Sequence, residues 1–194
     1  MIKLAIFVSG GGSNANEIIH YFKKHADIQV ALIVCNNPNA GALKIAENQG
    51  VPAIVFSKED FYKNSTLFEA LQRNAIDMII LAGFLWLIPG KLVQQYQNRI
   101  LNIHPSLLPK YGGKGMYGHY VHEAVKADNA KETGVTIHLV NEKYDDGSVL
   151  FQKKCKILPE MQAEEIAALV LKLEHKYFSP VIEKYALEYF NRHK

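Results

Sequence analysis

The sequence predicts an α/β fold: a doubly wound, mostly parallel sheet with helices on both faces. Three observations lead to this prediction. Short apolar runs alternate along the chain with segments of helical spacing, which is the pattern of β-α-β units. The first apolar run, residues 3–9, stops at three glycines and is followed by a helical segment. The run at residues 77–84 is apolar enough to lie at the centre of a parallel sheet.

Each further element follows from its hydrophobic spacing. Residues 58–73 place Phe61, Leu67 and Leu71 on one side of a helix. The last helix is predicted from residue 163 almost to the end of the sequence, and Pro180 is expected to break or kink it. The spacing predicts strands at residues 3–9, 30–35, 53–56, 77–84, 100–104, 135–140 and 149–155, and helices at residues 14–24, 43–48, 58–73, 118–127 and from 163 onward.

Length and composition favour one domain that spans residues 1–194. A hydrophobic fraction of 48% can fill a core at this size, and a net charge of +3 gives no reason to expect a nucleic acid or membrane partner. Cys35 and Cys155 form no CxxC spacing, so we expect neither a disulfide framework nor a zinc site, and we expect no bound metal. The N-terminus has no signal-peptide pattern, and we expect a cytoplasmic protein that is a monomer or a homodimer.

The glycine-rich segment after the first strand is a candidate anion site. Glycines let backbone amides approach a ligand, and the N-terminus of the following helix attracts negative charge. Ser13 or Asn14 can cap this helix and donate to phosphate oxygens. The loop lacks the Lys-Ser/Thr pair of a nucleoside triphosphate site, and Asn36 and Asn37 stand where a dinucleotide site would have an acidic residue. We therefore predict a site for a single phosphate; a glycine-rich turn without a ligand is the alternative.

The segment NIHPSLLP places Asn102 and His104 at the end of a predicted strand. Side chains two residues apart in a strand point the same way, so the amide and the imidazole lie side by side. Two donors aimed at one point can stabilise a developing oxyanion, and a histidine can also act as general acid or base. Ser106 lacks a nucleophile elbow, which favours direct attack by a bound substrate over a covalent enzyme intermediate. A histidine bonded to backbone alone is the alternative.

Three further polar residues are candidates for the same site. An aspartate from the turn at residues 145–147, if it lies close to His104, would favour the imidazolium form and raise the pKa of His104. A solvated turn is the alternative. Glu174 flanks the apolar stripe of the last helix, where it can face a cleft or be a solvated surface residue. His138 lies within a strand, and a packed or backbone-bonded role is at least as fitting for it.

Several segments taken together resemble one family. They are FVSGGGSN at the start, LAGFLWLIP followed by LNIHPSLLPKY, TGVTIHLVNEKYDDGSVLFQ, and LEHKYFSPVI in the last helix. Over essentially its whole length the chain resembles the phosphoribosylglycinamide formyltransferases, a branch of the folate-dependent formyltransferase family. The resemblance implies the formyltransferase fold, with a Rossmann-like N-terminal half. It also implies transfer of a formyl group from the co-substrate 10-formyltetrahydrofolate to the amine of glycinamide ribonucleotide, in de novo purine (IMP) biosynthesis.

The resemblance also implies roles for individual residues. Asn102 and His104 match the catalytic asparagine and the proton-donating histidine, and Asp145 matches the aspartate that raises the pKa of this histidine. The positions that match ribonucleotide-binding residues are Gly12, Ser13, Asn14 and Glu174, and those that match the folate pocket are Leu85, Trp86, Leu87, Ile88, Asn102, Val140 and Asn141.

Two segments depart from the family pattern. Trp86 stands where several relatives have a basic residue, which bears on any side-chain contact with folate. Residues 110–118 (KYGGKGMYG) are longer and richer in glycine than the equivalent stretch in many members, and we predict a mobile lid there. His119 and His122, near this lid, fit either the site or a surface helix.

Four other functions are weighed against this one. A 10-formyltetrahydrofolate hydrolase resembles the chain in its catalytic residues but typically has an extra N-terminal domain, and a methionyl-tRNA formyltransferase normally has a tRNA-binding domain. A sugar-amine formyltransferase shares the motif. A non-catalytic phosphate- or folate-binding module would not need Asn102, His104 and Asp145 together. The glycine loop and Glu174 favour the ribonucleotide as acceptor.

Overall fold

A computed structural model describes residues 1–63 and 65–192 and is built around a seven-stranded sheet of order β3-β2-β1-β4-β5-β6-β7. The strands from β1 to β5 pair in parallel, whereas β5 with β6 and β6 with β7 pair antiparallel. The predicted doubly wound, mostly parallel sheet is therefore confirmed. The strands are β1 (Ile2–Val8), β2 (Ile28–Cys35), β3 (Ala53–Val55), β4 (Met78–Leu81), β5 (Ile100–His104), β6 (Glu132–Leu139) and β7 (Val149–Lys156).

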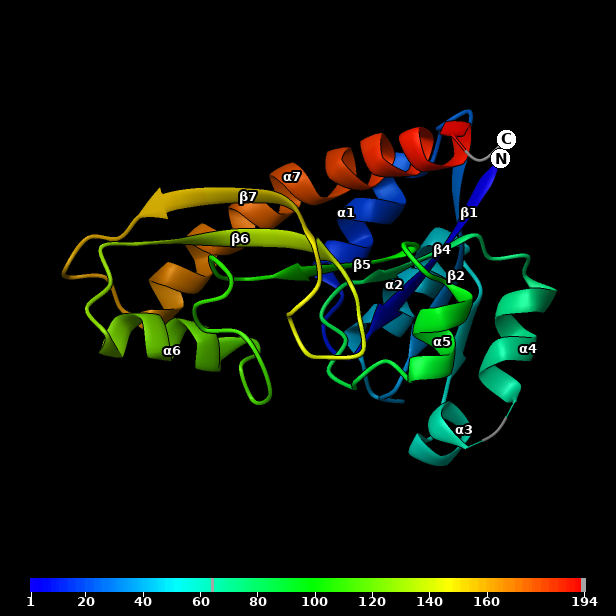
Figure 1. Ribbon diagram of the computed structural model, residues 1–194, viewed down its shortest axis with the longest axis horizontal. Coiled ribbons are helices and arrows are strands. Elements are labelled where there is room, and N and C mark those ends of the chain that lie inside the picture. The colour runs from blue at the N-terminus through cyan, green and yellow to red at the C-terminus, as the bar shows by residue number, and fades with distance from the viewer. Residues whose placement is uncertain (64, 193–194) are drawn as a thin grey trace.

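Helices cover both faces of the sheet (Figure 1). They are α1 (Ser13–Phe22), α2 (Gly41–Gln49), α3 (Lys58–Tyr62), α4 (Thr66–Arg73), α5 (Gly90–Gln95), α6 (His119–Ala127) and α7 (Ala163–Arg192). One face of the sheet packs against α1, α2 and α7, and the other packs against α3, α4 and α5. Because side chains alternate along a strand, β1 gives Leu4 and Ile6 to the first core and Ala5 and Phe7 to the second. A third, smaller cluster lies between α6 and the first turns of α7.

The helix predicted at residues 58–73 is two helices in the structure, α3 and α4. Ser57 caps α3 by accepting a hydrogen bond from the amide of Asp60, and Ser65 precedes the first residue of α4. Serine favours helix ends over helix interiors, which explains a new start at this point. Asn64 belongs to the predicted helix but lies outside the described residues.

Two other helices also differ from expectation. No element was predicted at residues 85–99, where α5 lies, because its six residues are too few to show a helical period. Pro180 does not break α7, which continues to Arg192. Phe178 and Ile182, on either side of the proline, are buried in the first core, and this packing offsets the lost backbone hydrogen bond.

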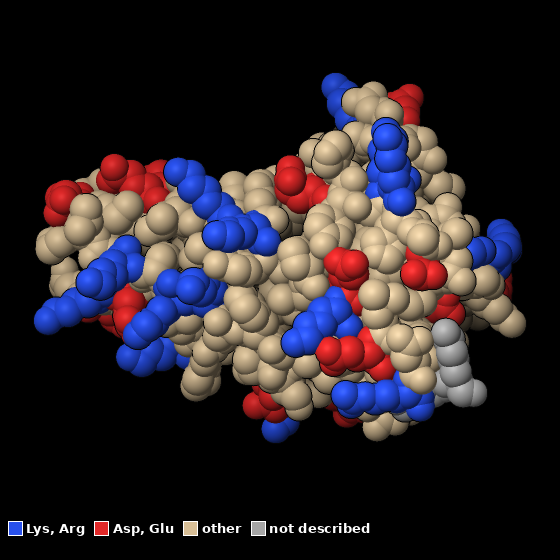
Figure 2. All heavy atoms as spheres, turned by 90° about the horizontal axis from the view of Figure 1, so that it is seen from above, with Lys and Arg blue, Asp and Glu red and all other residues tan. Residues whose placement is uncertain are grey.

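The surface carries charges of both signs. On the face shown in Figure 2, Lys and Arg side chains are interspersed with Asp and Glu side chains. The net charge of +3 is thus spread among opposite charges on this face. Within residues 1–63 and 65–192, no helix is long and apolar enough to cross a membrane.

Candidate active site

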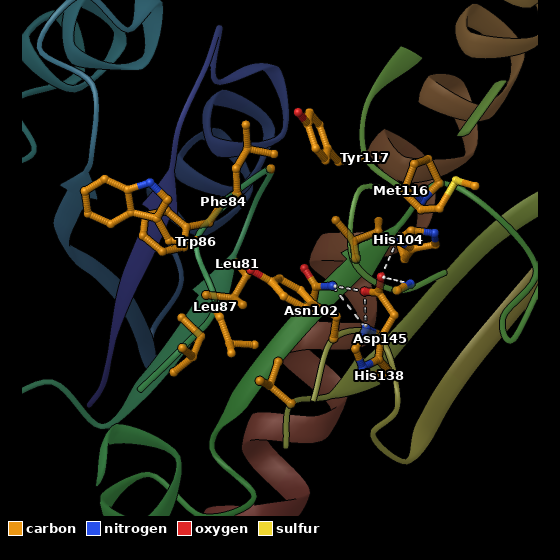
Figure 3. A pocket seen from close by; sticks show the side chains of 18 of the residues that line it. Leu81, Phe84, Trp86, Leu87, Asn102, His104, Met116, Tyr117, His138 and Asp145 are labelled. Carbon is orange, nitrogen blue, oxygen red and sulfur yellow. Dashed lines mark hydrogen bonds and ion pairs between the residues drawn. The ribbon is translucent and has the colours of Figure 1, made fainter. Parts of the chain in front are cut away.

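A cavity of about 450 Å³ lies at the carboxyl ends of β1, β4 and β5 (Figure 3). The direction in which the sheet is built reverses between β1 and β4, and ligands of doubly wound sheets bind at such a point. Gly12, Ser13 and Asn141 lie outside the set of described residues that line the cavity. The predicted residues that do line it are Asn14, Leu85, Trp86, Leu87, Ile88, Asn102, His104, Val140, Asp145 and Glu174.

Four polar side chains form one network on the wall of this cavity (Figure 3). Asn102 and His138 are register partners on β5 and β6, which brings Nδ2 of Asn102 to 3.0 Å from Nε2 of His138. The same amide nitrogen donates to Oδ1 of Asp145 at 3.3 Å. Oδ2 of Asp145 lies 3.4 Å from Nδ1 of His104 and accepts a hydrogen bond from the amide of Gly113 at 3.0 Å. Asn102, His104 and Asp145 therefore meet at one point.

His138, for which the sequence favours a packed or backbone-bonded role at least equally, is also a member of this network. Its Nδ1 lies 2.9 Å from the carbonyl oxygen of Leu139, which can only accept. Nδ1 therefore carries the proton of the neutral ring, and Nε2 accepts from the amide of Asn102. The backbone-bonded role was foreseen, but the second contact was not. The register of β5 on β6 would have revealed it, because that register sets residues 102 and 138 side by side.

The pKa of His104 corrects one expectation. Burial lowers this pKa below its ordinary value, and the ring is 4% exposed. Asp145 and the carbonyl group of Tyr111 raise it, as predicted for Asp145, and His138 lowers it further. Because burial is the largest of these effects, the net direction is downward. Asp145 thus raises the pKa of His104 as predicted, but in the protein without substrate burial has the larger effect.

Asp145 remains the charged member of the network. Burial opposes its ionisation, but the neighbouring imidazoles of His138 and His104 and the hydrogen bond from the amide of Gly113 outweigh burial. The pKa of Asp145 is therefore lowered. A negative charge is held next to His104 where the imidazolium would form.

The glycine loop differs from the prediction in how it caps α1. Gly12, and not Ser13 or Asn14, is the N-cap residue, with φ of 80°, and no side chain caps this helix end. A Cβ atom at residue 12 would lie 2.7 Å from Cβ of Ala42, at the start of α2. Glycine is thus required here by its backbone angle and by the close approach of a second helix.

Asn14 and Glu174 meet inside the cavity, although 160 residues separate them. Nδ2 of Asn14 donates to Oε2 of Glu174 at 2.5 Å. Burial raises the pKa of Glu174, which is 9% exposed, while the hydrogen bond from Asn14 lowers it. Oδ1 of Asn14 is buried and has no hydrogen-bond partner. The pair thus contains one buried acceptor atom that the described residues leave unsatisfied.

Neighbouring residues hold the segment at residues 85–88 in place. The amide of Leu85 donates to Oγ of Ser9 at 3.0 Å, and the hydroxyl of Tyr62 donates to the carbonyl oxygen of Leu87 at 2.9 Å. Sequence reasoning missed both Ser9 and Tyr62. The position of Ser9 at the end of a strand offered a signal, whereas nothing local marked Tyr62.

The indole of Trp86 belongs to an aromatic cluster. Its ring lies 5.2 Å from that of Phe61, 6.0 Å from that of Tyr62 and 6.1 Å from that of Phe84, measured between centroids. These contacts attach the segment at residues 85–88 to α3. Trp86 thus lines the cavity while most of its ring contacts are with the second core.

Val140, on the opposite wall, and its neighbour Asn141, which does not line the cavity, are held by different contacts. The amide of Val140 donates to the carbonyl oxygen of Ile100 at 2.9 Å, which fixes Val140 beside β5. The side chain of Asn141 instead accepts from the amide of Lys143 at 2.9 Å and donates to Asp146 at 3.2 Å. These bonds shape the turn that carries Asp145.

The predicted lid at residues 110–118 contributes residues 113–118 to the cavity wall. Its first part is tied down, because Ser106 donates to the carbonyl oxygen of Lys110 at 2.6 Å and Gly113 donates to Asp145. Mobility of the lid stays a prediction, and we expect it to be confined to residues 114–118. Of the two nearby histidines, His119 is exposed, whereas His122 is buried.

The fold and this site are those of a formyl transferase. The family profile described as formyl transferase matches residues 2–182, and the chain belongs to this family. It is 43% identical over 187 residues to the chloroplastic phosphoribosylglycinamide formyltransferase of Arabidopsis thaliana, which covers 93% of this chain and 64% of that protein. It is 36% identical over 190 residues to the phosphoribosylglycinamide formyltransferase of Bacillus subtilis, with 95% and 94% covered. The crystal structure of phosphoribosylglycinamide formyltransferase from Anaplasma phagocytophilum superposes with a TM-score of 0.87 at 28% identity, covering 96% of this chain and 88% of that one. This chain thus spans less than two thirds of the Arabidopsis relative.

Proposed function

We propose that this chain transfers a formyl group from 10-formyltetrahydrofolate to the amine of glycinamide ribonucleotide, a step of purine biosynthesis. The observation that carries the proposal is the meeting of two groups in one cavity. Asn102, His104 and Asp145 form one group, and the buried pair of Asn14 and Glu174 forms the other. The name of the Bacillus subtilis relative, matched over most of its length, supports phosphoribosylglycinamide as the acceptor.

The residues on the acceptor side suit a phosphorylated, hydroxylated amine. The N-terminus of α1 at Ser13 offers free backbone amides to a phosphate. Asn14 and Glu174 both line the cavity, and the Glu174 carboxylate would accept a hydrogen bond from a sugar hydroxyl. Gly12, Ser13, Asn14 and Glu174 are the ribonucleotide-binding residues of this proposal.

The residues proposed to bind the formyl donor suit a flat, partly apolar ring with an acidic tail. Leu85, Trp86, Leu87 and Ile88 form one apolar wall, and Val140 lies on the other. Lys114 and Lys143 also line the cavity and complement the carboxylates of a folate. We include Asn102 and Asn141 among the folate-binding residues, the latter as the shaper of its loop. The co-substrate of this proposal is organic, and the proposal includes no bound metal.

Asn102 and His104 would stabilise the formyl oxygen while the amine attacks the formyl carbon directly. A bond forms between the amine nitrogen and that carbon, the bond to the donor nitrogen breaks, and a proton passes from the amine to the donor nitrogen. His104 donates to the oxygen once it is protonated, and the charge of Asp145 favours that form against the effect of burial.

The first test mixes purified protein with the formyl-folate donor, with and without glycinamide ribonucleotide, and follows release of the folate product. We expect release that depends on the ribonucleotide and that His104→Ala abolishes. Equal release without the ribonucleotide would identify a hydrolase instead. No release with either mixture would overturn the proposal in favour of another acceptor, such as a sugar amine, or of a binding role.

Three further parts of the proposal concern the whole protein. We propose one domain over residues 1–194, a cytoplasmic location, and a monomer or homodimer that binds small molecules but neither nucleic acid nor membrane. The Arabidopsis relative is named as chloroplastic, so cell fractionation has to decide the location. Sedimentation at several concentrations decides between monomer and dimer.

A further inference from the structure

We propose that Tyr111 is a positioning residue for His104. Its backbone carbonyl group would hold the proton of the neutral His104 ring on Nε2. Nδ1 is then the nitrogen that faces the cavity and can take up a proton. Asp128, the C-cap residue of α6, would anchor Tyr111 in this role. The inference rests on the proposed function and deepens it, because it names the reacting nitrogen and the residues that select it.

The contacts of the imidazole ring indicate which nitrogen of His104 carries the proton. Nε2 of His104 lies 2.7 Å from the carbonyl oxygen of Tyr111, whereas Nδ1 lies 3.4 Å from Oδ2 of Asp145. A neutral ring has one N–H group, and a carbonyl oxygen can only accept. The shorter contact therefore takes the proton, and Nδ1 keeps its lone pair.

The position of the cavity indicates which nitrogen of His104 faces a bound substrate. Asn102 and Asp145 line the cavity and lie on the Nδ1 side of His104, as the dashed contact in Figure 3 shows. Tyr111 lies outside the described residues that line it. Nε2 thus points toward the chain behind the site, and Nδ1 points toward the place where a substrate would bind.

Tyr111 is itself held firmly. Its backbone φ is 55°, a left-handed value that is uncommon for a residue other than glycine. Its ring packs against the small cluster between α6 and α7, and its hydroxyl donates to Oδ2 of Asp128 at 3.0 Å. Asp128 is the C-cap residue of α6. The helix end thereby adds a side-chain anchor for Tyr111 to the hydrogen bonds that already hold the backbone at Lys110 and Gly113.

The roles of the two ring nitrogens of His104 are therefore the reverse of those in a Ser-His-Asp triad. In a Ser-His-Asp triad the aspartate holds Nδ1–H and Nε2 meets the substrate. Here a carbonyl group holds Nε2–H, and Nδ1 faces both the aspartate and the cavity. A proton taken up at Nδ1 can then be donated toward the formyl oxygen beside Asn102, without a rotation of the ring.

The test uses the full chain, labelled with ¹⁵N in its histidines and free of substrate. Above the pKa of His104, its signals should report a proton on Nε2 and none on Nδ1. The His104→Ala variant identifies which signals belong to this ring. Tyr111→Phe and Asp128→Ala both remove the anchoring hydrogen bond, and each should produce a mixture of the two tautomers.

Kinetics on the same variants separate positioning from general stability. Tyr111→Phe and Asp128→Ala should lower kcat by roughly tenfold, the effect of one lost hydrogen bond, with KM changed less than about twofold. The limb of the pH profile that reports His104 should move to lower pH, because the Tyr111 carbonyl group raises its pKa. Asp128→Asn keeps an acceptor and should restore the wild-type values. Tyr21→Phe, which removes an exposed tyrosine–carboxylate bond to Glu183, is the matched control.

Two results would overturn the inference: a proton on Nδ1 in the unmodified protein, or an unchanged tautomer and kcat in both anchor variants. The nuclear magnetic resonance measurement needs no substrate. It therefore decides the role of Tyr111 even if the protein fails to transfer a formyl group, and the two proposals can fail separately.

Discussion

His104 shows at the scale of one residue how burial and hydrogen bonding compete. Its ring nitrogens face two acceptors, the carbonyl group of Tyr111 and the carboxylate of Asp145, which together favour the imidazolium. Burial favours the neutral ring and has the larger effect. A site of this kind is neutral at rest and takes up a proton when negative charge develops beside it.

Removal of either partner of the His104–Asp145 pair should abolish most of the catalysis. His104→Ala removes one donor to the formyl oxygen, and such a loss typically costs about 3 kcal/mol of transition-state stabilisation, or roughly a hundredfold in kcat. Asp145→Asn should also lower the pKa of His104, because the charge that raises this pKa is gone. Steady-state kinetics over a range of pH measure both effects. Asp146→Asn, at the neighbouring exposed residue, should keep near-native kcat; near-native kcat in Asp145→Asn would contradict the assigned role.

His122 should make the protein sensitive to acid. It is 5% exposed, its Nδ1 has no hydrogen-bond partner, and burial followed by the charge of His104 lowers its pKa to about 4. The unfolded chain binds this proton near pH 6.5, so stability is lost as the pH falls from there toward 4, by about 3 kcal/mol in full. His122→Leu should therefore flatten the fall of the unfolding free energy over this range, as measured by urea titration. His20→Leu, at an exposed position, serves as control, and an equal fall in both variants would refute the expectation.

At the scale of elements, the connection from β1 to α1 forms the proposed anion site. β1 ends at Val8, Gly12 turns the chain with φ of 80°, and α1 starts at Ser13. The start of α2 closes over this turn, since the amide of Ala42 donates to the carbonyl oxygen of Gly10. The loop is thus shaped by two helices and not by its glycines alone.

Gly12→Ala should damage both stability and ribonucleotide binding. An alanine at residue 12 would have an unfavourable left-handed backbone angle, and its Cβ atom would clash with Ala42. Together these effects should lower the free energy of unfolding by about 1–3 kcal/mol. Gly50→Ala is the matched control, because φ there is 68° but a Cβ atom would meet nothing within 4 Å. The control should lose only about 1 kcal/mol and keep its KM. Thermal unfolding and KM for the ribonucleotide measure the two effects, and equal losses in the two variants would exclude a role for the contact with Ala42.

Elements with a strong local pattern could be predicted from the sequence. The strand that ends at Val8 stops at glycines, and the one that ends at His104 stops at a proline, so both were placed within one or two residues. The six-residue α5 and the division between α3 and α4 were missed because their patterns are short. Asn102 and His104 could be predicted because they share one strand face. His138 could not, because its role depends on strand register.

At the scale of the whole molecule, β5 joins two differently built parts of the sheet. On one side it pairs in parallel with β4, and on the other it pairs antiparallel with β6. The proposed acceptor residues come from α1 and α7, while the proposed donor residues follow β4 and β6. The cavity therefore depends on the relative placement of elements from the whole chain.

Each ligand should accordingly stabilise the whole fold. A ligand at 100 times its Kd raises the free energy of unfolding by about 2.7 kcal/mol when it binds only the folded state. Glu174→Gln should reduce this gain for the ribonucleotide, because it replaces the buried carboxylate beside Asn14, and should leave the gain for a folate analogue unchanged. Urea unfolding with each ligand alone measures both gains. Loss of both gains together would show that the variant disturbs the fold and does not act on one subsite.

The close approach of Gly12 and Ala42 also limits which residues can replace Ala42 during evolution. A larger residue at position 42 would press on the turn from a helix that contributes nothing else to the cavity wall. Substitutions there must therefore stay small or be matched by a change in the spacing between α1 and α2. A position outside the proposed ribonucleotide site is thus constrained by one within it, and the two positions should be expected to vary together or not at all.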